Sequence, residues 1–142
     1  MSGKAFLDTN ILIYAIETAG PDAEKSATAR QLTRSPDVCI STQVLGEFYS
    51  AATSARRLSP LAHNEAVAWV QYWKRLEVQP ITEPQIDLAL EIVGRHRIKY
   101  YDALILATAR LAGCRIVHSE DFSADQDYGG VRVLNPFQAG AG

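Results

Sequence analysis

The sequence predicts an α/β protein: a three-layer α/β/α sandwich built around a central parallel sheet. Two observations predict this class. Short apolar segments recur along the chain and alternate with longer helical stretches, the order expected of parallel strands joined by helical crossovers. The short segments are mostly apolar, as in strands that are covered on both faces. At 142 residues the chain has the length of one domain, which we expect to span residues 1–137 and to leave a frayed tail at 138–142.

In the first half of the chain, turn and capping residues set the predicted boundaries. Gly20-Pro21 separates the first two helices, and Thr42 is suited to cap the third. Ser59-Pro60 supplies an N-cap followed by proline at the first helical position, which predicts the start of a fourth helix. The elements expected here are strands at residues 4–8 and 38–41 and helices at 10–18, 22–34, 43–57 and 60–75.

In the second half, Thr82 and Gln85 have the spacing of a capping box, which predicts the start of a helix. Pro80 lies within the strand expected at residues 78–81, just before this helix. Because proline cannot donate to a neighbouring strand, it weakens this strand and favours a position at the edge of the sheet. Gly113 is expected to end the last helix. The elements expected here are strands at residues 78–81, 115–118 and 131–134 and helices at 82–97 and 102–112.

Composition narrows the functional classes. The apolar runs are far too short to span a membrane and no secretory signal is visible, so we expect a cytoplasmic protein. The formal net charge of −2 gives no global attraction for nucleic acid, so a polyanion would have to be bound through local basic residues or metal. Cys39 and Cys114 lie in apolar segments, and we interpret them as buried, reduced thiols in preference to a disulfide.

Asp8 is the first candidate functional residue. It closes the apolar run of residues 5–7 directly before a predicted helix, and ligands of open α/β sheets bind at the carboxyl ends of the strands. Asp121 follows the strand at 115–118, and Asp102 lies at the start of the last predicted helix. Glu47 falls at the rim of an apolar helical stripe, where a half-buried carboxylate needs a partner.

Each acid also has a simpler interpretation. Asp8 and Asp102 are suited to cap helices. Three further acids compete with Asp121 for the fourth position and are interpreted as solvated loop charges: Glu120, Asp125 and Asp127. Four carboxylates at one sheet edge would repel each other unless a cation joined them, so the set taken together predicts a metal site.

The donor types indicate which metal to expect. Carboxylate oxygens suit Mg²⁺ or Mn²⁺, which keep several waters and add substrate phosphate as a ligand. His63, His96 and His118 stand alone, and no Cys/His spacing suggests zinc. The chain also has no Ser/His/Asp elbow and no Gly-rich phosphate loop.

The acidic segments resemble those of the PIN domain family, in particular the VapC-like ribonuclease toxins of type II toxin–antitoxin pairs. The resemblance covers nearly the whole chain, and the order and spacing of the segments are more specific than any one of them. The matching segments are Phe6-Leu7-Asp8-Thr9-Asn10, Gly46-Glu47-Phe48, Tyr101-Asp102-Ala103-Leu104-Ile105, Ser119-Glu120-Asp121-Phe122, Gly130-Val131 and Asn135-Pro136-Phe137.

The resemblance implies a function and assigns roles. It implies a Mg²⁺- or Mn²⁺-dependent endoribonuclease that cleaves single-stranded RNA, acts as a toxin, forms a homodimer and is inhibited by a cognate antitoxin. The acidic tetrad of the family falls on Asp8, Glu47, Asp102 and Asp121. We expect Asp8 and Asp102 to be the principal metal ligands, and Glu47 and Asp121 to hold or orient metal-bound water. Three supporting positions also match the family: Thr9, Asn10 and Ser119.

Two other classes are compatible with such a fold. A non-catalytic RNA-binding or scaffold module would need an incomplete tetrad, whereas all four positions are acidic. A receiver-like signalling domain would need a lysine after a late strand, where this chain has residues 119–121, Ser-Glu-Asp.

Basic residues lie just before Asp102 in the sequence. Arg95, Arg97 and Lys99 are candidate RNA contacts, because an acidic protein needs local positive charge to bind a phosphate backbone. The alternative is that they complement the dipole of the helix that they end.

Overall fold

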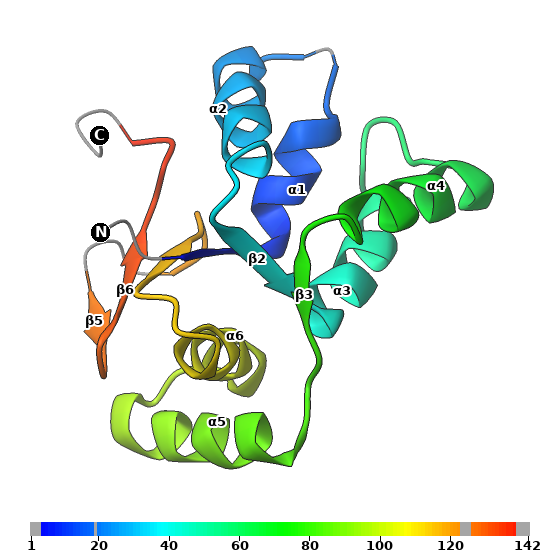
Figure 1. Cartoon of the computed structure of the whole chain (residues 1–142). Helices are drawn as coiled ribbons and strands as arrows, with labels where there is room; N and C mark the ends of the chain where they lie inside the picture. The colour runs from blue at the N-terminus through cyan, green and yellow to red at the C-terminus, as the bar shows by residue number, and fades with distance from the viewer. Residues whose placement is uncertain (1–3, 19, 123–125, 139–142) are drawn as a thin grey trace.

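The computed structural model describes residues 4–18, 20–122 and 126–138. Within these residues one sheet has the strand order β3-β2-β1-β4-β6-β5, with helices on both faces (Figure 1). The strands are β1 (Ala5–Leu7), β2 (Val38–Ser41), β3 (Glu77–Gln79), β4 (Ile116–His118), β5 (Asp127–Tyr128) and β6 (Val131–Leu134). The helices are α1 (Thr9–Ile16), α2 (Ala23–Thr33), α3 (Thr42–Ala52), α4 (His63–Trp73), α5 (Glu83–His96) and α6 (Tyr100–Leu111).

The strand order places a topological switch between β1 and β4. The chain moves from β1 to β2 to β3 in one direction and then returns to β4 on the other side of β1. Since crossovers between parallel strands are right-handed, this reversal puts α1 to α4 on one face and α5 and α6 on the other (Figure 1). The carboxyl ends of β1 and β4 therefore border the crevice where open α/β sheets bind ligands.

The predicted α/β class with a parallel central sheet is confirmed, with one addition. β1, β2, β3, β4 and β6 pair in parallel, whereas β5 pairs antiparallel with β6. β5 was not predicted, because two residues are too few to produce a recognisable pattern. Its hairpin turn contains Gly129 and Gly130, both at positive φ, a conformation that favours glycine.

Burial explains the composition of the central elements. Phe6 and Leu7 of β1 and Ile40 of β2 are fully buried between the two helical layers. In α6, every residue from Ala103 to Ala109 is buried, because this helix lies between the sheet and α5 (Figure 1). A helix that is apolar on nearly all sides is the sequence signature of such a position.

Two predicted boundaries differ from the structure by three residues or more, while the others differ by at most two. α3 ends at Ala52, not near residue 57, as the Thr53 hydroxyl donates to the Tyr49 carbonyl and Ser54 begins a local turn. α4 begins at His63, not at Pro60, and the Glu65 carboxylate accepts from the Ala62 amide at its start.

The capping predictions have mixed outcomes. Ser41, not Thr42, caps α3 by accepting from the Val44 amide, while the Thr42 hydroxyl accepts from the Ile81 amide. The capping contact predicted for Thr82 and Gln85 is confirmed. Gly113, at a φ of 83°, follows α6 as expected.

The predictions about the cysteines, membrane spans and C-terminal tail can be compared with the structure. Cys39 and Cys114 are both buried, as expected, and are free cysteines whose sulfur atoms lie 3.1 Å apart. No helix in the described ranges is long and apolar enough to cross a membrane. Residues 139–142 of the predicted tail lie outside the described part of the chain.

Candidate active site

Asp8 lies at the carboxyl end of β1 and is the most enclosed acid of the site, with 6% of its surface exposed. One carboxylate oxygen accepts from the Thr9 amide at 2.7 Å, and the other accepts from the Ser119 hydroxyl at 2.7 Å. The Asp8 amide donates to the His118 carbonyl of the neighbouring strand β4 at 3.0 Å. Asp8 is the N-cap of α1, so its capping interpretation is correct, but its carboxylate is also held by Ser119, directly after β4.

The surroundings of Asp8 disfavour its charge. Burial raises the pKa of the Asp8 carboxyl from 3.8 to about 6. The hydrogen bonds from Ser119 and Thr9 lower this pKa, while the negative charges of Asp121 and Glu47 raise it. A positive charge in the site would relieve this penalty.

Glu47 occupies the second turn of α3, and both of its carboxylate oxygens accept hydrogen bonds. The Thr9 hydroxyl donates to Oε1 at 2.8 Å, and the Gln43 amide donates to Oε2 at 3.1 Å. Glu47 is half-buried while Val44 and Phe48 beside it are fully buried. The predicted place at the rim of an apolar stripe is confirmed.

Asp121 and Glu120 have opposite surroundings. Asn10 donates to the Asp121 carboxylate at 3.0 Å and to the Ser119 hydroxyl at 3.3 Å. The Glu120 carboxylate accepts instead from Tyr14 at 2.8 Å and forms a 2.6 Å ion pair with Lys25. Because Glu120 is engaged with α1 and α2, Asp121 is the better placed fourth acid.

The other two acids that compete for the fourth position are less suited to it. The Asp127 carboxylate accepts from the Gly130 amide in the β5–β6 turn, as expected of a loop acid. Asp125 lies outside the described residues.

Asp102 lies in the first turn of α6 and is half-buried. Its side chain makes no capping hydrogen bond in the described structure, so the capping interpretation is wrong. Burial raises the pKa of the Asp102 carboxyl, the positive charge of Lys99 lowers it, and Asp121 and Glu47 raise it. Asp121 and Glu47 thus act on both Asp8 and Asp102, and the structure brings the four predicted acids together at one end of the sheet.

Three residues at positions that match the family contact the acids: Thr9, Asn10 and Ser119. Thr9 contacts both Asp8 and Glu47, and Asn10 contacts Asp121. Ser119 donates to Asp8 and accepts from the Asp121 amide at 3.1 Å.

Sequence reasoning missed two contacts of the site. Gln43 lies one helical turn before Glu47, and this i, i+4 spacing could have identified it as a partner. The Tyr14–Lys25–Glu120 cluster joins α1 and α2 to a loop about a hundred positions later, so no local pattern could have identified it.

The donor set fits a hard divalent cation. All four acids present carboxylate oxygens, the ligand type that Mg²⁺ and Mn²⁺ prefer, and Asp8 and Asp102 carry pKa values raised by burial and by their acidic neighbours. In the described residues, no three His, Cys, Asp or Glu side chains are already grouped as metal ligands. Binding of an ion would therefore require adjustment of these side chains.

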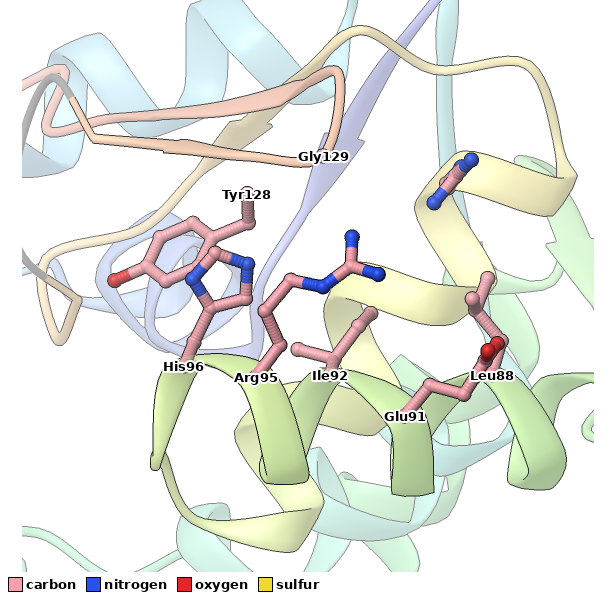
Figure 2. A pocket seen from close by; sticks show the side chains of 8 residues that line it. Leu88, Glu91, Ile92, Arg95, His96, Tyr128 and Gly129 are labelled. Carbon is pink, nitrogen blue, oxygen red and sulfur yellow. The ribbon is translucent and has the colours of Figure 1, made fainter.

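The three basic residues predicted to contact RNA have different surroundings. Lys99 is exposed and acts electrostatically on Asp102. Arg97 ends α5 in a left-handed conformation, with a φ of 56°. Arg95 lines a hollow of about 180 Å³ together with His96, Arg110 and the β5–β6 turn (Figure 2). Of the three, only Lys99 has an interaction with the acidic site that the structure resolves.

None of the three histidines joins a group of possible metal ligands among the described residues. His63 bonds the Tyr49 hydroxyl, and the His96 ring packs edge-on against Tyr128 (Figure 2). Burial lowers the pKa of His118 within β4. These surroundings agree with structural or surface roles.

The fold and the acidic site together define an α/β protein with a carboxylate centre at its topological switch. The chain belongs to the PIN domain family, whose model matches residues 5–126. No curated protein matches the chain at the level of sequence.

Solved structures share the fold over most of their length. A toxin–antitoxin complex from Klebsiella pneumoniae aligns with a TM-score of 0.69 and 20% identity, covering 95% of this chain and 99% of that one. VapC20 of Mycobacterium tuberculosis, described as a sarcin-ricin loop cleaving toxin, aligns with a TM-score of 0.63 and 26% identity, covering 83% and 90%. DNA-bound VapBC from Salmonella typhimurium aligns with a TM-score of 0.65 and 23% identity, covering 95% and 99%.

Proposed function

We propose that this protein is a Mg²⁺- or Mn²⁺-dependent endoribonuclease that cleaves single-stranded RNA and serves as the toxin of a toxin–antitoxin pair. The observation that carries the proposal is the arrangement of Asp8, Glu47, Asp102 and Asp121 in one site, where burial and the charges of Asp121 and Glu47 raise the pKa of Asp8 and Asp102. The family membership and the similarity to VapC20, a toxin described as cleaving the sarcin-ricin loop, support it.

The roles of the residues follow from their surroundings. A bound divalent cation would supply a water of lowered pKa and neutralise charge that develops on the phosphate. Asp8 and Asp102 would hold the cation, because their burial leaves them most in need of a positive partner. Glu47 and Asp121, each fixed by neighbouring donors, would orient the water and the phosphate.

Ser119, Thr9 and Asn10 would keep this set in place. Ser119 joins Asp8 to the Asp121 backbone, and Thr9 joins the Asp8 carboxylate to that of Glu47. Asn10 makes two contacts with the loop after β4. Its side-chain nitrogen donates to the Asp121 carboxylate, and its side-chain oxygen accepts from the Glu120 backbone amide. Fixed geometry of this kind is what catalysis by positioned charges requires.

Two protein partners belong to the proposal. Similar structures include toxin–antitoxin complexes, which supports a cognate antitoxin for this chain. A basic antitoxin side chain such as arginine would pair with the carboxylates of the site. A homodimer is proposed from the family resemblance.

The test is cleavage of a fluorogenic single-stranded RNA by the purified protein. EDTA should abolish cleavage, and Mg²⁺ or Mn²⁺ added in excess should restore it. Undiminished cleavage in EDTA would contradict the metal mechanism. RNA binding without cleavage under any metal condition would favour the alternative of a non-catalytic RNA-binding module.

A further inference from the structure

Gln43 is a side chain of the site that no role above explains. It lies in the first turn of α3, is half-buried and uses one amide nitrogen for two hydrogen bonds. The nitrogen donates to Glu47 Oε2 at 3.1 Å and to the Tyr101 carbonyl at 3.1 Å. Tyr101 precedes Asp102 in α6, so this one side chain contacts both an acid of α3 and the backbone beside an acid of α6.

The two contacts join opposite helical layers. α3 packs against α1 on one face of the sheet, whereas α6 packs on the other face with α5 (Figure 1). Glu47 belongs to the first layer and Asp102 to the second. The Gln43 amide therefore ties the two layers together between the carboxylates that each of them contributes.

The orientation of the amide is fixed by its neighbours. The reversed orientation would point the amide oxygen at a carboxylate oxygen and a carbonyl oxygen, neither of which can donate. In the orientation adopted, Gln43 Oε1 is buried and has no hydrogen-bond partner among the described residues. A buried acceptor without a partner is unfavourable and uncommon in native structures, and it often accompanies a functional constraint.

We infer that Gln43 is a positioning residue that sets the Glu47 carboxylate relative to the start of α6 and Asp102. The inference rests on the proposed function, since it concerns the same acidic site. The Thr9 hydroxyl holds one oxygen of Glu47 and Gln43 holds the other, so removal of Gln43 leaves the carboxylate held at one oxygen only. Displacements of this kind reduce the rate of a reaction that depends on exact placement.

The decisive variant is Gln43→Met, which keeps the length of the side chain but removes both donations and the unpaired acceptor. We expect at least a tenfold loss of kcat for RNA cleavage with KM changed less than twofold, and a melting temperature that is unchanged or raised. A merely structural residue would show the opposite pattern, a lowered melting temperature with kcat retained. Gln31→Met is the matched control, because Gln31 is an exposed glutamine of another helix, α2.

A second variant, Gln43→Glu, tests the need for a donor. Glutamate has the same shape but cannot donate to the Glu47 carboxylate or the Tyr101 carbonyl, so kcat should fall at least as far as in Gln43→Met. Activity retained in Gln43→Glu would overturn the inference, because shape alone would then suffice.

Titration with Mn²⁺ in the absence of RNA separates this inference from the proposed function. We expect Gln43→Met to bind Mn²⁺ at least threefold more weakly than the wild type in calorimetry, with Gln31→Met unchanged. If the wild type binds Mn²⁺ but does not cleave RNA, the proposed function fails, and this difference in affinity still decides the role of Gln43. Equal affinity and equal kcat in Gln43→Met and wild type would overturn the inference alone, and absence of Mn²⁺ binding by the wild type would overturn both.

Discussion

Replacement of Asp8 by Asn should stabilise the metal-free protein, and only above about pH 4. Burial raises the pKa of the Asp8 carboxyl from 3.8 to about 6, so the folded protein holds this proton more tightly than the unfolded chain does. Below pH 4 the carboxyl is protonated in both states and carries no penalty. As the pH rises from about 4 to about 6, the unfolded chain ionises while the folded protein keeps the proton, and the free energy of unfolding of the wild type falls. The penalty is complete near neutral pH.

The size of the effect follows from the same values. A pKa that moves from 3.8 to about 6 corresponds to a loss of roughly 3 kcal/mol at neutral pH. The Asp8→Asn variant would recover only part of this, because the new amide would face the Ser119 hydroxyl, which already accepts from Asn10 and from the Asp121 amide. We expect a net gain of about 1–2 kcal/mol for Asp8→Asn near pH 7.5.

Urea denaturation in EDTA from pH 4 to pH 8 measures this gain for Asp8→Asn against the wild type. Asp87→Asn is the matched control, since Asp87 is an exposed carboxylate of α5 whose replacement should change the free energy of unfolding little at any pH. A difference that does not grow between pH 4 and pH 7.5, or an Asp8→Asn variant that is less stable near neutral pH, would refute the electrostatic reasoning.

Three further predictions concern other parts of the site and its partners. Asp121→Asn should remove most RNA cleavage, while Glu120→Gln should retain most of it, because the Glu120 carboxylate is paired with Lys25. The reverse result would make Glu120 the fourth acid of the site. Replacing both Arg95 and Arg97 with Gln should weaken RNA binding and reduce the slope of log affinity against log salt by roughly one to two units. The slope is measured with catalytically inactive protein. An unchanged slope would mean that the two arginines only complement the α5 dipole. Co-expression with the adjacent upstream reading frame should yield a stable complex with suppressed cleavage, and separate elution of the two chains in size-exclusion chromatography would contradict an antitoxin encoded there.

The fold and the acidic positions could be predicted because they depend on local sequence and on one topological rule. An apolar run followed by an acid identifies a strand end, as at Asp8, and parallel strands bring such ends to the same edge of a sheet. Glu47 was predicted from helical periodicity and from the resemblance of residues 46–48, and its place beside buried Val44 and Phe48 is set by a spacing of three to four residues.

Other features depend on contacts between distant segments. The pairing of Glu120 with Tyr14 and Lys25 joins residues about a hundred positions apart, so the sequence left the fourth acid ambiguous. The start of α4 at His63 shows another limit. Pro60 satisfies the preference for the first helical turn, but the chain forms a connection here instead, in which the Leu61 amide donates to the Ala52 carbonyl.

The most direct test of the account is RNA cleavage by wild type and Asp102→Asn, purified in parallel and assayed in Mn²⁺ with single-turnover kinetics. Asp102 lies in the first turn of α6, and its replacement by Asn keeps the shape of a half-buried side chain while removing a ligand charge. We predict cleavage by the wild type that requires Mn²⁺ and a loss of at least a hundredfold in Asp102→Asn, with the melting temperature unchanged or raised. Equal cleavage by both proteins would mean that the activity does not come from this site, and it would contradict the assignment of the four carboxylates as a cation-dependent nuclease centre.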